Sequence, residues 1–304
     1  EKMPMSTRLR TVDSLPHIGL PHPFSVPQAQ GTTFMDLFYW DTYFTNLGLL
    51  SLGDLRQAKN NVDDILYLIE RYGYMPNAAN TGLLNRSQPP YASMMVREVY
   101  GRTGDREWLR GAVETLKKEY DFWMTERITP SGLNRHFNSA TREELLGFYG
   151  YLCSDRFPKM GKVPRTDDEK VAIASNYLSE AEGGWDFNPR FGGVCEEYNP
   201  VDLNANLYIY ERNFAWFCRE LGQNGAKNWE KKAKTRRNLI QKLCFEPSDG
   251  LFYDYDYVTG RRSGIFSSAV FNLLWAGIPT PEQAASLVEN LDRLECAHGI
   301  AACE

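Results

Sequence analysis

Apolar residues recur at spacings of three and four along most of this 304-residue chain, and this helical period limits its possible folds more than any other feature. One clear run places Val62, Ile65 and Ile69 on the same face, and Gly73 follows where a helix-ending glycine is expected. The alternation typical of strands is confined to a segment near 250–260. We therefore expect an all-α chain with a short β-hairpin or extended segment there.

The predicted helices come in pairs, with short connections inside a pair and longer ones between pairs. The expected helical ranges are 37–72 with a break at 53–54, 91–102, 105–127, 141–146, 166–181, 200–221, 224–244, 267–276 and 281–294. The long connections are rich in aromatic and polar residues. This asymmetry favours a ring of helical hairpins whose long loops gather at one face. The alternative is an ordinary helical array without a site, and the chemistry of the loops argues against it.

Composition narrows the classes of ligand and environment. Hydrophobic residues make up 42% and charged residues 24%, which is typical of a soluble globular protein, either cytoplasmic or exported. A net charge of -5 does not suggest a nucleic-acid partner, and no apolar run reaches the length of a membrane span. The six cysteines form no Cys-x-x-Cys pair and there are only four histidines, so we expect no metal site, and we read Cys218 and Cys244 as buried thiols.

Four loop or helix-start segments combine aromatic rings with Asp, Asn, Arg or Gln side chains. They span residues 34–44, 74–90, 180–191 and 199–207. Aromatic faces stack on the C–H faces of sugars, and planar polar side chains bind sugar hydroxyls. The alternative for any single aromatic residue is packing between helices.

Asp186 is the residue in these segments best suited to chemistry. It follows two glycines and lies between Trp185 and Phe187. Cleavage of a glycosidic bond needs a proton donor at the leaving oxygen, and the pKa of that donor must be raised by burial or by a nearby negative charge. Apolar neighbours and a glycine-preceded backbone suit that role. The alternative is a loop aspartate that caps a turn.

Taken together, the four segments resemble the trehalases and their relatives among the (α/α)6-barrel glycosidases. The matching elements occur in the family's order and are Tyr-Trp-Asp at 39–41, Pro-Asn at 76–77, Arg-Ser-Gln-Pro-Pro at 86–90, Gly-Trp-Asp-Phe at 184–187 and Pro-Val-Asp-Leu-Asn at 200–204. The resemblance runs from about residue 24 to the C-terminus. It implies one (α/α)6-type catalytic domain over 1–304, with an irregular N-terminal segment at about 1–33.

The resemblance also implies individual roles. Asp186 would be the general acid of an inverting glycoside hydrolase that cleaves α,α-trehalose or a related α-linked glucoside. The residues that it assigns to sugar binding or to positioning the acid are Phe34, Trp40, Asp41, Asn77, Arg86, Gln88, Arg165, Asp167, Gly184 and Trp185. The implied ligand is a small carbohydrate, a disaccharide, and no cofactor is expected. The alternatives are a glucosidase of different disaccharide specificity, a non-catalytic sugar-binding protein on the same scaffold, and a helical scaffold for protein partners.

Two features depart from the family's pattern. Thr33 stands where an arginine usually precedes the phenylalanine of the first motif, which weakens the expectation of strict trehalose specificity. The chain also ends at Glu304, where the family's Gln-Trp-Asp-x-Pro segment would be expected. The general base is therefore not visible in this chain. We expect an incomplete toroid and a 304-residue chain that is inactive alone.

Other polar residues are assigned structural roles. Asp41 has a second interpretation as the N-cap of the helix that follows it. Asp202 is expected in a first helical turn, where it interacts favourably with the helix dipole. We interpret the adjacent Glu196 and Glu197 as a solvated pair. The alternating Asp254 and Asp256 are interpreted as polar faces of an extended segment.

Overall fold

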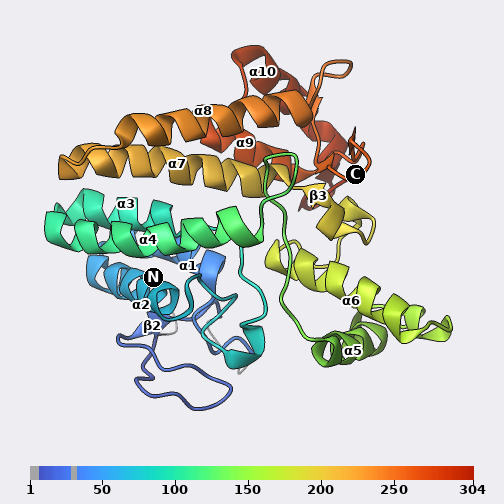
Figure 1. The fold of residues 1–304 in the computed structure, drawn as a ribbon, viewed down its shortest axis with the longest axis horizontal. Coiled ribbons are helices and arrows are strands. Elements are labelled where there is room, and N and C mark those ends of the chain that lie inside the picture. Colours follow the sequence, from blue (N-terminus) through green and yellow to red (C-terminus); the bar gives the residue numbers. More distant parts are fainter. Residues whose placement is uncertain (1–6, 29–32) are drawn as a thin grey trace. The chain divides into compact units, whose positions relative to one another are not determined.

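A computed structural model of the protein describes residues 7–28 and 33–304. By its internal contacts the chain divides into two compact units: unit 1 comprises residues 1–126 and 206–235, and unit 2 comprises residues 127–205 and 236–304. Long helices make up most of unit 1, unit 2 combines shorter helices with irregular segments, and every strand in the described ranges is two residues long (Figure 1). The all-α prediction is confirmed. Parts of the predicted irregular N-terminal segment, 1–6 and 29–32, lie outside the described residues.

Unit 1 is built from helical hairpins. Its helices are α1 (Tyr39–Ser51), α2 (Leu55–Tyr72), α3 (Ala92–Thr103), α4 (Arg106–Glu126), most of α7 (Val201–Leu221) and the first half of α8 (Ala226–Leu243). The ends follow local chemistry. Gly73 ends α2 with φ of 83°, and Asp105 accepts hydrogen bonds from the backbone N–H groups of Glu107 and Trp108 at the start of α4. Both ends agree with the sequence prediction.

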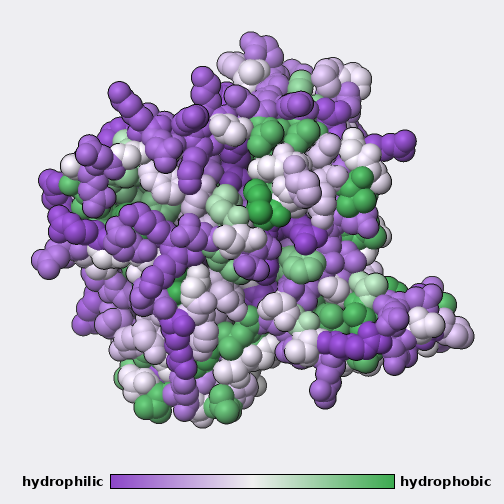
Figure 2. All heavy atoms as spheres, in the orientation of Figure 1, coloured by the Kyte–Doolittle hydropathy of each residue, from purple (hydrophilic) through white to green (hydrophobic). Residues whose placement is uncertain are grey.

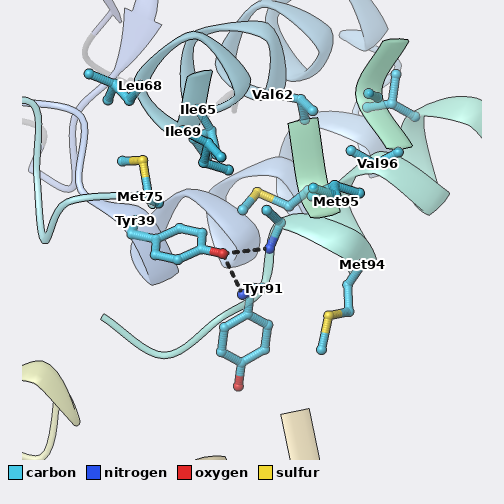
Figure 3. Packing of buried hydrophobic residues seen from close by; sticks show 14 of the residues in the cluster. Tyr39, Val62, Ile65, Leu68, Ile69, Met75, Tyr91, Met94, Met95 and Val96 are labelled. Carbon is cyan, nitrogen blue, oxygen red and sulfur yellow. Dashed lines mark hydrogen bonds between the residues drawn. The ribbon is translucent and has the colours of Figure 1, made fainter. Parts of the chain in front are cut away.

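The core of unit 1 is apolar around a small buried polar network. Ile65 and Ile69 of α2 and Met95 of α3 belong to one buried cluster (Figure 3). Within it the hydroxyl oxygen of Tyr39 accepts hydrogen bonds from the backbone N–H groups of residues 91 and 92, at 3.1 and 3.0 Å. The same hydroxyl donates to Oε1 of Glu119 at 2.6 Å. The start of α3 is thus tied to α1 and α4 through one side chain.

Unit 2 contains a second set of helices and small antiparallel strand pairs. Its elements are α5 (Arg142–Tyr151), α6 (Asp167–Glu182), the first turn of α7, the second half of α8, β3 (Tyr198–Asn199), β4 (Phe245–Glu246), β5 (Leu251–Phe252), β6 (Tyr255–Asp256), β7 (Arg261–Arg262), α9 (Phe271–Ala276), α10 (Pro281–Glu289), β8 (Glu295–Cys296) and β9 (Gly299–Ile300). Strands β3, β6 and β7 form one sheet in that order. The predicted extended segment near 250–260 corresponds to β5, β6 and the turn into β7.

Helix α5 is longer than the predicted 141–146. It runs to Tyr151 and continues as a π-helical turn, Leu152–Arg156. Two glycines in this stretch weaken its helical pattern in the sequence. Packing outweighs that cost, because Leu145 and Tyr149 are buried in one cluster with Leu178 of α6. The helix begins with a capping box between Thr141 and Glu144.

The surface is predominantly polar. On the face shown in Figure 2, hydrophilic residues predominate and hydrophobic residues form small separate patches. Over the described ranges, no helix combines the length and the apolar character needed to cross a bilayer. Cys218 and Cys244 are buried free thiols, as predicted.

Candidate functional site

In unit 1 the first two polar–aromatic segments lie side by side. The backbone N–H of Tyr39 donates to the carbonyl of Asn77 at 3.2 Å, and that of Ala79 donates to the carbonyl of Leu37 at 2.9 Å. An antiparallel bridge pairs residues 38 and 78 between these two contacts. Segments separated by a whole helical hairpin in the sequence are therefore adjacent in the fold. The structure brings together the residues predicted around Trp40 and Asn77.

Hydrogen bonds between uncharged groups fix the cluster of side chains where these two segments of unit 1 meet, which includes Asn77 and Gln88. Oε1 of the buried Gln88 accepts from the backbone N–H of Trp40 at 3.1 Å. The amide of Asn77 donates to the carbonyl of Ser87 at 2.9 Å, and its backbone N–H donates to the carbonyl of Arg86 at 3.0 Å. A conformation held by several short-range bonds loses little further entropy when a ligand binds. Asn77 and Gln88 are thus pre-organised side chains.

The remaining predicted residues of unit 1 surround this cluster. Asp41 is in the first turn of α1, but the N-cap is Phe38, so the interpretation of Asp41 as an N-cap is wrong. As an acidic residue in a first turn it still interacts favourably with the helix dipole. Phe34 is 48% exposed and meets Phe38 edge to face, with ring centroids 5.7 Å apart. Thr33 is exposed.

Asp36 is a residue of the first segment that sequence reasoning missed. It is buried and accepts from Nη2 of Arg10 at 2.6 Å and from Nδ2 of Asn80 at 2.9 Å. Nδ1 of His17 lies 2.9 Å from the same carboxylate. These contacts fasten the N-terminal segment to the loop that carries Asn77. The only signal in the sequence is an acidic residue two positions after Phe34.

In unit 2 the third segment forms a tight turn after α6. Gly184 has φ of 73°, a backbone conformation that glycine adopts without strain. Asp186 at the tip of the turn is exposed, whereas Trp185 and Phe187 on either side are partly buried. The predicted apolar neighbours of Asp186 are present. Burial of Asp186 itself is not observed.

A buried ion-pair cluster holds the base of this turn. Arg190 is fully buried; its guanidinium donates to Asp202 at 2.7 Å and to Asp254 at 2.7 and 2.8 Å. Nε1 of Trp185 donates to Oδ2 of Asp202 at 2.7 Å. Burial opposes ionisation of Asp202, but the charge of Arg190 outweighs it and lowers the pKa of that carboxyl. Charge-assisted, bidentate bonds of this kind fix geometry strongly.

This ion-pair cluster tests two sequence predictions. Asp202 is in the first turn of α7 and has a structural role, as predicted. Asp254 is 1% exposed and paired with Arg190, so its interpretation as a polar face of an extended segment is wrong. Arg190 itself was not assigned, although it follows Asp186 by four residues on the same loop.

Glu180 is a second carboxyl associated with the turn. It is fully buried, and its Oε1 accepts from the backbone N–H of Asn188 at 2.8 Å. Burial raises the pKa of Glu180 to about 7, the backbone hydrogen bond opposes that shift, and the nearby negative charge of Asp186 adds to it. The side chain of Asn188 in turn donates to the carbonyl of Trp185 at 2.6 Å. The two carboxyls therefore interact, and the raised pKa is that of the buried Glu180.

Two further carboxylates form ion pairs or hydrogen bonds in and around α6. Glu182, the last residue of α6, pairs with Arg127 at 2.9 Å and lies 3.3 Å from His136. Burial opposes ionisation of Glu182, but these partners prevail and lower its pKa to about 2. Glu196 accepts from the hydroxyls of Ser175 and Ser179 at 2.5 and 2.8 Å. The interpretation of Glu196 as part of a solvated pair is therefore wrong.

The predicted pair Arg165 and Asp167 lies at the start of α6 in unit 2. Arg165 donates to the hydroxyl of Tyr149 at 3.1 Å and to the carbonyl of Met160 at 2.8 Å. Asp167 is more than half exposed and pairs with Lys170 at 2.8 Å. Within the ranges that the structure describes, no three His, Cys, Asp or Glu residues are arranged to hold a metal ion.

Comparisons with known proteins place the chain among its relatives. A family model described as "Trehalase" matches residues 5–303. A periplasmic trehalase of Xanthomonas axonopodis pv. citri is 30% identical over 88% of this chain and 49% of its own length. A cytosolic neutral trehalase of Saccharomyces cerevisiae is 31% identical over 93% of this chain and 42% of its own length. The chain thus spans about half the length of the curated relatives it matches.

Solved structures give the same result for the fold. Neutral trehalase Nth1 from Saccharomyces cerevisiae matches 98% of this chain and 60% of its own chain, with a TM-score of 0.79 and 27% identity. A GH63 mannosylglycerate hydrolase from Thermus thermophilus matches 89% of this chain and 73% of its own, with a TM-score of 0.60 and 19% identity. These likenesses confirm the predicted fold class, (α/α)6.

Proposed function

The chain belongs to the trehalase family, and we propose on that basis that it contributes the general acid and sugar-binding residues of an inverting glycoside hydrolase. The proposed substrate is α,α-trehalose or a related α-linked glucoside, a small disaccharide. The observation that carries the proposal is the turn of Asp186. Asp186 is exposed in this turn, its two neighbours in the sequence are aromatic residues with anchored side chains, and the buried carboxyl of Glu180 interacts with it.

The chemistry follows from what each group can do. Asp186 in its protonated form donates to the glycosidic oxygen as the bond breaks. Its exposure leaves the carboxyl accessible to a substrate. Inversion also requires a second carboxylate that activates water on the opposite face of the sugar. We assign only the acid among the residues of this chain.

The binding roles are part of the same proposal. Asn77, Arg86 and Gln88, with Trp40, Asp41 and Phe34, bind sugar hydroxyls and the apolar face of a sugar ring. The neutral hydrogen bonds that fix Asn77 and Gln88 support this role. Gly184 and Trp185 position the acid, and Arg165 with Asp167 contributes further contacts. Thr33 favours a substrate range wider than trehalose alone.

We also propose that both units belong to one catalytic domain. The division between them cuts through α7 and α8, so each unit contains part of both helices. Neither unit is continuous in the sequence. A helix cut at its middle loses the cooperative hydrogen bonding that stabilises it, which makes independent folding of either unit unfavourable.

The test is Asp186→Asn in the full-length protein. NMR of the products from a panel of α-linked disaccharides reports the substrate and the anomer released. We expect the variant to fold normally and to lose about 100- to 10,000-fold in kcat, because amide replaces the proton donor. The matched control is Asp168→Asn, which changes an exposed aspartate of unit 2. Wild-type binding of disaccharide without hydrolysis would instead support a non-catalytic sugar-binding protein.

A further inference from the structure

Phe187 has an unusual backbone conformation immediately after Asp186. Its φ is 62°, and no other non-glycine residue in the described ranges has a positive φ. The left-handed region is accessible to glycine and to some asparagine and aspartate residues, but it is strained for a bulky aromatic residue. Such strain persists only where the surrounding structure holds it in place, and it clusters at functional sites. The backbone N–H of Phe187 hydrogen-bonds to the carboxyl of Glu180, and the side chain makes further contacts.

Those contacts form a cage around the ring of Phe187. Tyr177 of α6 and Phe157 meet it edge to face, at centroid distances of 5.7 and 6.2 Å. Phe148 of α5 is tilted against it at 6.3 Å, and the guanidinium of Arg156 lies 5.5 Å from its centroid. Aromatic pairs and a cation over a ring at these distances are favourable contacts. The ring is thus held by α5, by the π-helical turn after it and by α6.

The rest of the turn is fixed independently of that ring. Trp185, on the other side of Asp186, is held by its bond to Asp202 at 2.7 Å. Asn188 is held by Glu180 at 2.8 Å and by the carbonyl of Trp185 at 2.6 Å. With these residues fixed, the direction of the Asp186 side chain depends on the conformation of Phe187.

We propose that Phe187 is a positioning residue for Asp186, and that its aromatic cage holds the left-handed turn that presents the carboxyl. This inference rests on the proposed function, in which Asp186 is the acid. Phe187 does not touch the reacting atoms in this assignment. Three of the side chains around its ring come from the segment 148–157. The sequence of this segment carries no catalytic motif, and under this proposal the segment supports the geometry of the acid.

Phe191 is a matched comparison within the same loop. It is buried, its ring lies 5.7 Å from Tyr198, and Arg190 lies 4.7 Å from its centroid. It therefore has a ring neighbour and a cation neighbour, as Phe187 has. It lies in a 3₁₀ turn, Pro189–Phe191, with ordinary backbone angles. A purely structural aromatic residue of this loop should behave like Phe191.

The test compares four variants of the full-length enzyme. Phe187→Leu removes the ring, and Phe187→Gly also removes the backbone strain. Phe187→Tyr retains the ring, and Phe191→Leu is the control. We expect the Leu and Gly variants at 187 to lose about 100-fold in kcat with KM little changed, because a displaced acid lowers the rate without removing substrate contacts. Phe187→Tyr and Phe191→Leu should stay within about threefold of wild-type kcat.

Wild-type kcat in Phe187→Gly would overturn the proposal, since the ring would then be dispensable. An equal loss of kcat in Phe191→Leu would also overturn it.

Hydrogen exchange provides a readout independent of turnover. In the 304-residue chain, the backbone amides of residues 185–188 should exchange at least about tenfold faster in Phe187→Leu than in wild type, and at an unchanged rate in Phe191→Leu. Unchanged exchange in Phe187→Leu would refute the positioning role. If exchange rises as expected while the wild-type enzyme hydrolyses no sugar, the proposed function fails and the support of this turn by Phe187 stands.

Discussion

Buried carboxyl groups with neutral partners and those paired with a cation differ in protonation, and a comparison of groups from the two units shows this. In unit 1, Glu119 accepts from the hydroxyls of Tyr39 and Tyr210, and Asp64 accepts from the backbone N–H of His22. Burial raises the pKa of Glu119 to about 7 and that of Asp64 to about 8, against the opposing effect of these bonds. In unit 2, Glu182 pairs with Arg127, and its pKa falls to about 2 despite burial. The partner, rather than burial itself, decides the direction of the shift.

The opposite shifts give these carboxyls opposite effects on the pH dependence of stability. Asp64 keeps its proton in the folded state after the unfolded chain has lost it, so its contribution to stability falls as pH rises from 3.8 to about 8. Glu119 acts in the same direction between 4.5 and about 7. Glu182 has the opposite sign: its contribution is complete above 4.5 and is lost as pH falls towards about 2. Asp64 and Glu119 should therefore weaken unit 1 as pH rises towards about 8, and Glu182 should weaken unit 2 as pH falls below 4.5. Glu180 of unit 2, whose pKa burial raises to about 7, acts in the same direction as Glu119.

The largest effect should come from removing a cation of unit 2. Arg190→Met leaves Asp202 and Asp254 buried without their counter-charge, and we expect a loss of about 3–5 kcal/mol in the free energy of unfolding. Denaturant titration measures the loss, and hydrogen exchange locates it in unit 2. Arg261→Met, at an exposed position of β7, is the control. A loss of under about 1 kcal/mol would mean that the ion pairs do not stabilise unit 2.

The next largest effect should be a gain in unit 1. Asp64→Asn keeps an oxygen for the N–H of His22 and removes the charge that burial disfavours. At pH 8.5 we expect the variant to be more stable by about 2–3 kcal/mol. Each pH unit by which a pKa differs between the folded and unfolded states corresponds to about 1.4 kcal/mol, and the expected gain is smaller than the whole difference would give because the site relaxes. At pH 4 the two proteins should be nearly equal. An equal gain at both pH values would contradict the linkage to Asp64.

A third substitution tests how much a neutral hydrogen-bonding group stabilises unit 1. Tyr39→Phe removes the acceptor for two backbone N–H groups at the start of α3 and a donor to Glu119. We expect a loss of about 2 kcal/mol at pH 6. The loss should grow towards pH 8, because ionised Glu119 would lack one of its hydrogen bonds. Urea denaturation at both pH values measures it, and a loss independent of pH would separate Tyr39 from the titration of Glu119.

The smallest effect should come from Gln88→Ala. Its amide oxygen accepts from the N–H of Trp40 in the first turn of α1, where water replaces it in part. We expect a loss of about 1 kcal/mol at any pH between 5 and 8, since no charge is involved. Thermal unfolding at two pH values checks this. A pH-dependent loss would show that this cluster is coupled to the titrating groups of unit 1.

Sequence reasoning succeeded for most of the long helices, whereas it misplaced the N-cap of α1 and the end of α5. The helix predicted at 105–127 is observed at Arg106–Glu126, and that at 200–221 is observed at Val201–Leu221. Caps and helical periods involve residues within four positions of one another, so a short window contains the whole cause. The grouping of Trp40 with Asn77 was also predicted, through the order of the family's motifs.

The errors about buried polar residues share one physical origin, which is distance along the chain. Asp254 lies 64 residues from its partner Arg190, and Glu196 lies 21 residues from Ser175. From the sequence alone, a polar residue in a loop is interpreted as solvated, because its partner is distant in the sequence and meets it only in the folded chain. Arg190, Glu180 and Phe187 were overlooked for the same reason, since their roles arise from contacts with α5, α6, α7 and the segment before β6.

The sequence by itself determined the helical hairpins, the family and the identity of the residue proposed as the acid, because periodicity and motif order are written in consecutive residues. Only the tertiary structure decided which carboxyls keep their protons and which are ionised, because the protonation state of a buried carboxyl depends on the partner that the folded chain brings to it. Tertiary contacts likewise decided the left-handed turn at Phe187. Four side chains, three from residues 148–157 and one from α6, hold its ring there, and no local preference would place it so.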